Sequence, residues 1–188
     1  IPSQYKTAVV VQTLLNEPDA VDRALEALEV RYLGNADPLL VYGLLADLPD
    51  ADAEHLPEDE KILARAASLI AGLRERHPQG HFFTLFRRRQ LNPKQGRWMG
   101  WERKRGKIEE FNLLLLGSRE TSFLAEESDY HLLEGVNYVV TLDNDSQLPR
   151  GVVKRLIGTI VHPLNAAVVQ VDEEVSGKGR VIDGYGII

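Results

Sequence analysis

The sequence predicts an α/β domain in which a mostly parallel sheet carries helices on both faces. Three observations support this prediction: short apolar runs alternate with amphipathic stretches, the apolar runs are continuous, and glycine, proline or acidic residues separate the two. Continuous apolar runs are typical of parallel strands that are covered on both sides, whereas half-exposed strands alternate apolar and polar residues. The expected order is β-α-β-α-β, a basic loop, one or two helices, and then β-α-β.

The first half of the chain contains three apolar runs of strand length, at residues 7–11, 39–46 and 81–86. Two amphipathic stretches lie between them, and each repeats apolar residues at helical spacing: Val21, Leu25, Leu28 and Tyr32 in one, and Ile62, Leu63, Ala66, Leu69, Ile70 and Leu73 in the other. Gly34 follows the first predicted helix, and Pro78 follows the second. The acid-rich residues 48–59 are expected to form a surface loop.

The second half of the chain continues the same alternation. The predicted elements are, in order, a helix over 107–116, a partly helical segment over 118–135, a strand over 138–142, a helix over 149–161 and a strand over 166–171. Gly117 and Pro163 follow the two helices, and Asp143 follows the fourth buried strand. The glycine-rich tail from Gly177 is expected to form a hairpin or an open loop.

Length and composition indicate a single globular domain that spans residues 1–188. A chain of this length buries about 70% of its unfolded surface, and its 44% hydrophobic and 27% charged residues give no sign of disorder. The absence of cysteine excludes disulfides, thiolate zinc sites and cysteine nucleophiles. No apolar run approaches the length of a membrane span, so we expect a soluble segment. Because neither Ile1 nor the Ile187-Ile188 end resembles a natural terminus, we expect a fragment of a longer polypeptide.

The net charge of −6 conceals an uneven distribution. Residues 87–107 contain nine basic side chains and one acidic side chain, and also Trp98 and Trp101. We call this segment the basic aromatic loop. An isolated basic segment in an acidic protein indicates an anionic partner at one place and argues against a general nucleic-acid surface.

Candidate functional residues follow three of the predicted strands, where ligands bind in doubly wound sheets. They are the segment 13–17, Asp47, and Asp143-Asn144-Asp145. The sequence has no G-x-G-x-x-G, no G-K-[ST], no H-E-x-x-H and no G-x-S-x-G motif. These absences argue against a dinucleotide fold, a P-loop, a zinc protease and a serine hydrolase.

Asp143 and Asp145 are candidate ligands of a divalent cation. Two carboxylates at positions i and i+2 of a strand end can both reach one hard cation such as Mg²⁺ or Mn²⁺, which completes its coordination with water and phosphate oxygens. Without a cation, a carboxylate about 4 Å from a phosphate is repelled by about 1 to 4 kcal/mol. The alternative interpretation is that Asp145 or Ser146 caps the helix that Pro149 opens.

The basic aromatic loop allows three interpretations. It can cover a diphosphate or an anionic leaving group, it can be an ordinary solvated charged loop, or its interleaved aromatic and basic residues can contact a bilayer or stack on sugar. A non-catalytic module that docks through this loop on anionic lipid, glucan or a partner domain is therefore an alternative function. RNA binding is less favoured because the loop lacks the required aromatic pattern.

Four stretches of the sequence resemble the bacterial cyclic β-1,2-glucan synthases. They are GRWMGWERKRGKIEEFN at 96–112, VTLDNDSQLPRG at 140–151, HPLN at 162–165 and GYGI at 184–187. The opening residues 7–15 and the LLAD that ends at Asp47 fit as well. The resemblance spans nearly the whole chain, and it implies the donor-binding half of a GT-A-type (nucleotide-diphospho-sugar transferase) glycosyltransferase domain, truncated at its C-terminal side.

The resemblance implies an inverting transferase that binds UDP-glucose with Mg²⁺ or Mn²⁺ and builds a β-1,2-glucan on a glucan acceptor. Asp143 and Asp145 match the D-x-D metal motif, Asp47 matches the acid that faces uridine, and Lys107 and Asn112 match a K-x-x-x-x-N element near the nucleotide. Thr13 and Glu17 lie in the turn after the first strand, and with Asp47, Lys107, Asn112 and Asp143 they complete the implied donor site. The parent synthases are membrane proteins, and this domain is expected at the cytoplasmic face of the inner membrane.

Two features depart from the family pattern. At the first-strand turn the usual Pro-Thr-Tyr is replaced by Gln12-Thr13-Leu14, which leaves no aromatic ring for stacking on uracil. Inversion also needs a general base, which in related enzymes follows the D-x-D half in a T-E-D-like motif. Asp172, Glu173 and Glu174 lack that context. We therefore expect the base and the acceptor motif beyond residue 188, no catalytic residue in this fragment, and weak or no donor binding by the fragment alone.

Overall fold

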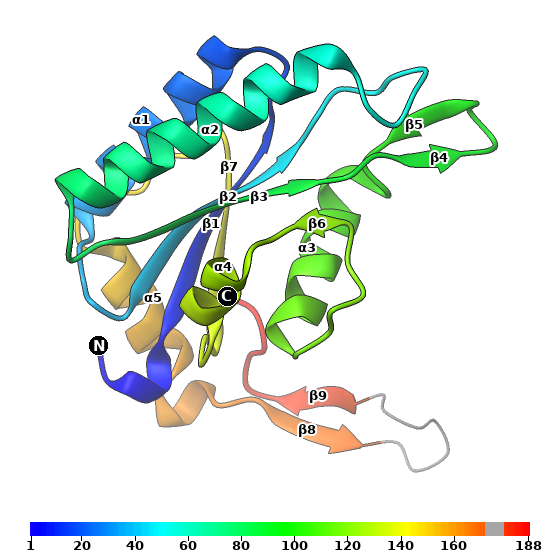
Figure 1. Cartoon of the computed structure of the whole chain (residues 1–188). Coiled ribbons are helices and arrows are strands. Elements are labelled where there is room, and N and C mark those ends of the chain that lie inside the picture. The colour runs from blue at the N-terminus through cyan, green and yellow to red at the C-terminus, as the bar shows by residue number, and fades with distance from the viewer. Residues whose placement is uncertain (172–178) are drawn as a thin grey trace.

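A computed structural model of the chain describes residues 1–171 and 179–188. Its centre is a five-stranded sheet with the order β6-β3-β2-β1-β7, in which the four long strands are parallel and β6 is antiparallel (Figure 1). The strands of this sheet are β1 (Thr7–Leu14), β2 (Leu40–Asp47), β3 (His81–Arg87), β6 (Phe123–Leu124) and β7 (Tyr138–Asp143). The predicted mostly parallel α/β fold is confirmed, and it is compatible with a GT-A-like fragment.

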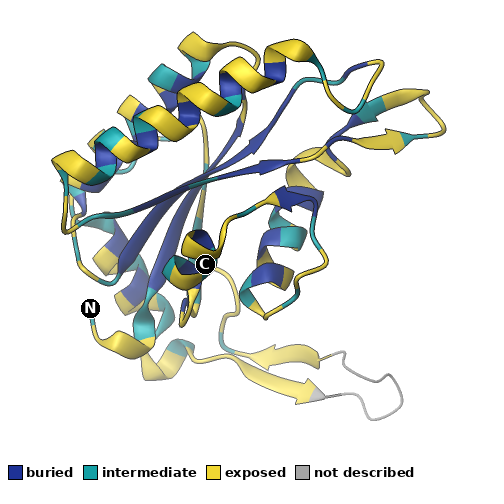
Figure 2. Ribbon diagram, in the orientation of Figure 1, coloured by how far each residue is buried: buried dark blue, intermediate teal, exposed yellow. Residues whose placement is uncertain are grey.

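Helices cover both faces of the sheet. The α-helices are α1 (Pro18–Gly34), α2 (Pro57–Arg76), α3 (Arg103–Leu115), α4 (Glu127–Leu133) and α5 (Val152–Ile160), and 3₁₀ turns lie at Ser3–Tyr5 and Pro163–Asn165. One core joins α1, α2 and α5 to the face that carries Val9 and Val11. A second core joins α3 and α4 to the face that carries Ala8 and Val10. Figure 2 shows the resulting continuous buried centre.

Helix α2 begins earlier than its apolar stripe predicts. It starts at Pro57, inside the segment that we expected to be a surface loop. Proline is favoured in the first turn, and the Asp59 carboxylate accepts a hydrogen bond from the Leu56 N–H at 2.8 Å. Asp59 is buried, so this part of the acid-rich segment is not a solvated loop.

The basic aromatic loop is more structured than predicted. It contains an antiparallel hairpin of β4 (Gln90–Asn92) and β5 (Arg97–Met99), in which Gly96 adopts a φ of 62°. Such a backbone conformation costs glycine little, and it allows the tight return between the strands. Helix α3 also begins four residues before Lys107, so the end of this segment is helical.

The C-terminal strand does not join the central sheet. The predicted strand is present as β8 (Val168–Val171), but it pairs antiparallel with β9 (Gly179–Asp183) in a separate hairpin (Figure 1). The hairpin alternative for the tail is thus confirmed in the described residues, although Gly177 itself lies outside them. Asp172, Glu173 and Glu174 also lie outside the described residues. Among the helices of the described ranges, none is long and apolar enough to cross a membrane.

Candidate functional site

The strand register places three polar side chains on one face of the sheet at its carboxyl edge. Gln12 of β1 is opposite Asp143 of β7, and Leu14 of β1 is opposite Asp47 of β2. Side chains two residues apart on a strand share a face, and paired residues of parallel strands do so too. Gln12, Asp47 and Asp143 therefore all face the side on which α3 packs.

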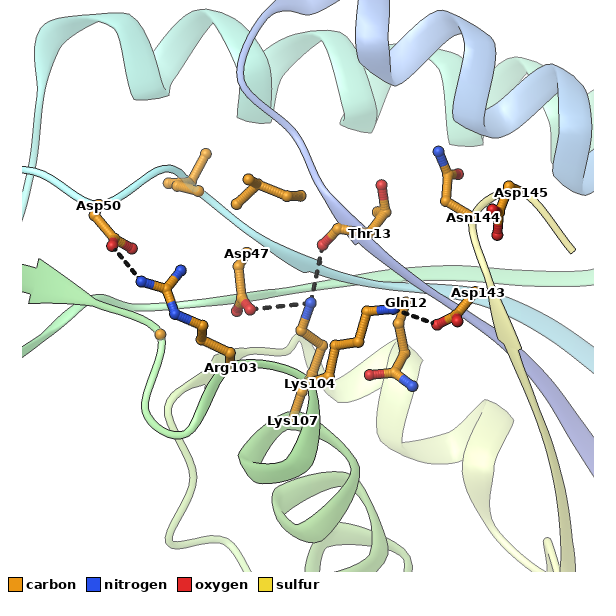
Figure 3. A pocket seen from close by; sticks show the side chains of 13 residues that line it. Gln12, Thr13, Asp47, Asp50, Arg103, Lys104, Lys107, Asp143, Asn144 and Asp145 are labelled. Carbon is orange, nitrogen blue, oxygen red and sulfur yellow. Dashed lines mark hydrogen bonds and ion pairs between the residues drawn. The ribbon is translucent and has the colours of Figure 1, made fainter.

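A pocket of about 520 Å³ opens at this edge, between the strand ends and the first turn of α3 (Figure 3). The residues that line it are Gln12, Thr13, Leu14, Asp47, Leu48, Asp50, Gly100, Arg103, Lys104, Lys107, Asp143, Asn144 and Asp145. Of the predicted site residues, the structure thus brings together Thr13, Asp47, Lys107, Asp143 and Asp145. Because these residues come from three strand ends and one helix, only the folded chain forms the pocket.

Asp47 is held between two buried cations. The guanidinium of Arg87 donates from Nε to Oδ1 at 2.8 Å and from Nη2 to Oδ2 at 3.0 Å. On the other side, the Lys107 ammonium lies 3.0 Å from Oδ2, as Figure 3 shows. The Arg87 side chain has no exposed surface. A fork of two parallel bonds fixes the orientation of a carboxylate as well as its charge. Asp47 therefore enters the pocket as a fixed, neutralised acceptor.

Lys107 connects α3 to the first two strands. Its Nζ donates to the Thr13 carbonyl at 2.9 Å and pairs with Asp47, and its side chain is 3% exposed. Burial lowers the pKa of Lys107, and the charge of Asp47 opposes that shift. The lysine therefore fixes the floor of the pocket, with Thr13 contributing its backbone carbonyl.

Arg87 also positions the start of α3, a role that the sequence analysis missed. Its two terminal nitrogens donate to the carbonyls of Trp101 at 2.8 Å and Arg103 at 2.9 Å. A β-carbon on Gly100 would lie 2.7 Å from Nη2 of Arg87, so this position requires glycine. In the sequence Arg87 is one of nine basic residues of the basic aromatic loop. The available signal was that Arg87 directly follows the predicted strand 81–86, as Asp47 follows the predicted strand 39–46.

The Asp143–Asp145 turn presents two carboxylates to the pocket. Asp143 Oδ1 accepts a bond from Lys104 Nζ at 2.6 Å, and Asp145 is exposed at the rim. No cluster of three or more metal-binding side chains occurs in the described ranges. Two carboxylates at one turn, of which Asp143 already attracts a cationic group, nevertheless fit a divalent ion whose other ligands are water and phosphate.

The capping interpretation of this motif is wrong. Helix α5 begins at Val152 after Gly151, and no side chain of residues 143–146 caps it. The Asn35 side chain supplies the contact instead, since its Oδ1 accepts the Val153 N–H at 3.3 Å. Asp143 and Asp145 are therefore free of a capping role.

Arg31 of α1 binds the backbone of the same turn, a contact that the sequence analysis did not predict. Its Nη2 donates to the carbonyls of Asn144 at 2.9 Å and Ser146 at 2.8 Å, whereas Nε and Nη1 are buried and have no hydrogen-bond partner among the described residues. Burial lowers the pKa of Arg31. Burying a guanidinium whose donors are partly unpaired costs free energy. The two bonds to the turn therefore offset part of this cost, and the packing around Arg31 must hold it in place.

Replacing Arg31 with methionine is expected to loosen the D-x-D turn without unfolding α1. Loss of two charge-assisted bonds predicts amide hydrogen exchange at Ser146 that is about tenfold faster or more. Native-state exchange followed by NMR measures this rate. Arg23→Met is the control, because Arg23 is exposed and, within residues 1–171 and 179–188, pairs with the exposed Glu17 alone. Equal Ser146 protection in both variants would contradict the role of Arg31.

Two predicted donor-site residues do not line the pocket. Glu17 precedes α1 and pairs with Arg23 at 3.2 Å, and Asn112 is an exposed residue of α3. The side chain of Thr13 belongs to the opposite face of β1 from Gln12. Of the residues predicted for the donor site, the pocket is therefore lined by Thr13, Asp47, Lys107 and Asp143, and by neither Glu17 nor Asn112.

Acidic residues of the segment after β2 neutralise much of the basic aromatic loop. Arg103 pairs with Asp50 at 2.7 Å and Arg97 with Asp52 at 2.5 Å, and the buried Arg89 forms two bonds with Asp59. The interpretation of this loop as a solvated charged surface is thus wrong for Arg87, Arg89 and Lys107, which are all buried. Through these three buried side chains, the basic aromatic loop connects neighbouring elements inside the protein.

Comparison with known proteins places the chain within a much longer relative. A scan against protein-family models found no match. The chain is 42% identical over 191 aligned residues to cyclic beta-(1,2)-glucan synthase NdvB of Rhizobium meliloti (strain 1021). The alignment includes 100% of this chain and 6% of the relative, so the chain spans only a small part of that protein's length. The family resemblance seen in the motifs is confirmed: along its whole length the chain is similar to one segment of a cyclic β-(1,2)-glucan synthase.

Proposed function

We propose that this chain is the donor-binding part of a glycosyltransferase that uses UDP-glucose and a divalent cation to build a β-1,2-glucan. The observation that carries the proposal is one pocket that combines the D-x-D carboxylates with Asp47 and Lys107 at the carboxyl edge of a parallel sheet. The similarity to a cyclic glucan synthase along the whole chain supports the same class of reaction.

Four of the residues that line the pocket have a role in this proposal. Asp143 and Asp145 would hold Mg²⁺ or Mn²⁺, which when bound offsets the charge of a diphosphate and of the departing nucleotide. Oδ1 of Asp47 accepts one bond from Arg87, which leaves one lone pair of that oxygen for a donor N–H of the uracil ring. Lys107 fixes that carboxylate in place and adds positive charge at the pocket floor.

The pocket lacks an evident general base among the described residues. Asp47 is neutralised by two cations, Asp50 pairs with Arg103, and Asp143 and Asp145 are assigned to the metal. The proposal therefore places the base and the acceptor site in the remainder of the parent polypeptide, and the chain alone is expected to be inactive. The parent would act at the cytoplasmic face of the bacterial inner membrane.

Calorimetry tests the proposal directly. Titration of the chain with UDP-glucose in the presence of Mn²⁺ is expected to give weak but saturable heats. Asp145→Ala should reduce the affinity by about tenfold or more, because one of two protein carboxylates is lost. Asp52→Ala, which removes an exposed acid that does not line the pocket, is the matched control. Equal heats from wild type and Asp145→Ala would count against the assignment.

Docking through the basic aromatic loop is less supported than donor binding. Arg97 and Arg103 already have carboxylate partners, so an anionic surface would have to replace existing ion pairs. Trp101 is 43% exposed and Trp98 is partly buried beside Ala51, with which it forms a β-bridge. The loop thus offers few unpaired cations and one exposed ring to such a surface.

A further inference from the structure

Among the ion pairs formed by residues that line the pocket, the pair of Lys104 and Asp143 is the one in which both side chains are more than half exposed. Lys104 Nζ lies 2.6 Å from Asp143 Oδ1, and the two side chains are 66% and 51% exposed (Figure 3). Lys107, one turn further along α3, is 3% exposed and bound to two fixed acceptors. Lys104 can therefore move, whereas Lys107 cannot.

The position of Lys104 is not explained by helix stability. Helix α3 begins with Arg103, Lys104 and Arg105 and has no acidic residue in its first turn. Positive side chains at a helix N-terminus oppose the helix dipole, and such a terminus favours an anion. Arg103 and Lys104 both line the pocket, so this concentration of positive charge faces the predicted ligand.

We propose that Lys104 occupies the cation position on Asp143 as long as no metal is bound there, and moves to the diphosphate when a metal–nucleotide complex binds. This inference rests on the proposed function and adds a residue to it. A divalent cation on Asp143 Oδ1 and an ammonium 2.6 Å from that oxygen repel each other, so the cation must displace the lysine. The released ammonium remains on the first turn of α3, at the rim where the diphosphate would lie.

Two effects of opposite sign follow. Without nucleotide, Lys104 competes with the metal for Asp143. An exposed ion pair contributes little free energy, so this competition weakens the metal affinity by at most about fivefold. With nucleotide, Lys104 gains a charge-assisted bond to phosphate, which strengthens binding by about tenfold or more. Lys104 therefore favours the metal–nucleotide complex over the free metal ion.

The test compares Lys104→Met with wild type in two titrations of the whole chain. Electron paramagnetic resonance measures the concentration of free Mn²⁺ and therefore reports how much is bound. One titration uses Mn²⁺ alone, and the other uses Mn²⁺ with saturating UDP. We expect Lys104→Met to bind Mn²⁺ alone up to about fivefold more tightly, and to bind it about tenfold more weakly than wild type when UDP is present. Arg105→Met, which removes a neighbouring exposed charge that does not line the pocket, should match wild type in both titrations.

The other outcomes are distinguishable. If wild type binds Mn²⁺ with UDP and Lys104→Met behaves identically, the role of Lys104 is overturned while the proposed function stands. If Lys104→Met loses both modes of binding, the lysine only orients Asp143, and the exchange of partners is wrong. If wild type binds neither Mn²⁺ nor its UDP complex, the proposed function fails, and the inference fails with it. Lys104→Gln, whose side chain is of similar length, serves as a second variant. A thermal midpoint near that of wild type shows that its change in metal binding does not come from unfolding.

Discussion

Replacing Arg87 with methionine is expected to lower the free energy of unfolding by about 3 to 5 kcal/mol. The side chain is fully buried, and it supplies both bonds of the fork to Asp47 and the donors for the carbonyls of Trp101 and Arg103. Methionine fills a similar volume but leaves the Asp47 carboxylate with Lys107 alone. Removing one partner of a buried ion pair costs more than the pair contributes, because the remaining charge stays desolvated.

Urea unfolding followed by circular dichroism measures this loss. Arg88→Met is the matched control: Arg88 is the next residue, is exposed, and donates one bond to the Thr121 carbonyl at 3.3 Å. Its loss should stay within about 0.5 kcal/mol. Adding Asp47→Asn to Arg87→Met should recover part of the stability, because the amide carries no charge. A loss for Arg87→Met as small as that for Arg88→Met would contradict the role of Arg87 in holding Asp47 and the start of α3.

Replacing Gly43 with alanine is expected to cost about 1 to 3 kcal/mol or more, although alanine usually stabilises a chain relative to glycine. Gly43 is central in β2 and lies opposite Phe83 of β3. A β-carbon there would lie 2.2 Å from the Phe83 ring, which is fully buried and stacks on Phe111 of α3. The ring must move, and the helix that carries Lys104 and Lys107 would move with it.

A double-mutant cycle with Phe83→Leu tests this account. The smaller side chain leaves room for the β-carbon, so Gly43→Ala should cost clearly less in that background. Gly72→Ala in α2 is the control with the opposite sign, because its β-carbon would meet only the end of the Arg76 side chain at 3.5 Å. That change should stabilise the protein by about 0.5 to 1 kcal/mol. Equal costs of Gly43→Ala with and without Phe83→Leu would rule out the steric explanation.

The sequence predicted the strands of the sheet well, because their signal is local. Residues 7–11, 39–46, 81–86 and 138–142 each correspond to one of the four long parallel strands, with ends that differ by at most three residues. The acids that follow two of these strands were consequently predicted at the correct edge. The small elements β4, β5 and β6 were missed, since two or three residues carry no periodicity of their own.

The sequence by itself determined the fold class, the carboxyl-edge position of Asp47 and Asp143, and the family, because continuous apolar runs and long motifs are properties of neighbouring residues. Only the tertiary structure decided how these acids are held. Arg31 contacts Asn144, Arg87 contacts Asp47, and Lys104 contacts Asp143, and each pair is separated by 39 or more positions. No local pattern encodes such pairs, since the fold brings the two partners together. For Arg31 and Arg87, burial also removes water from the charge, which makes the contact energetically necessary.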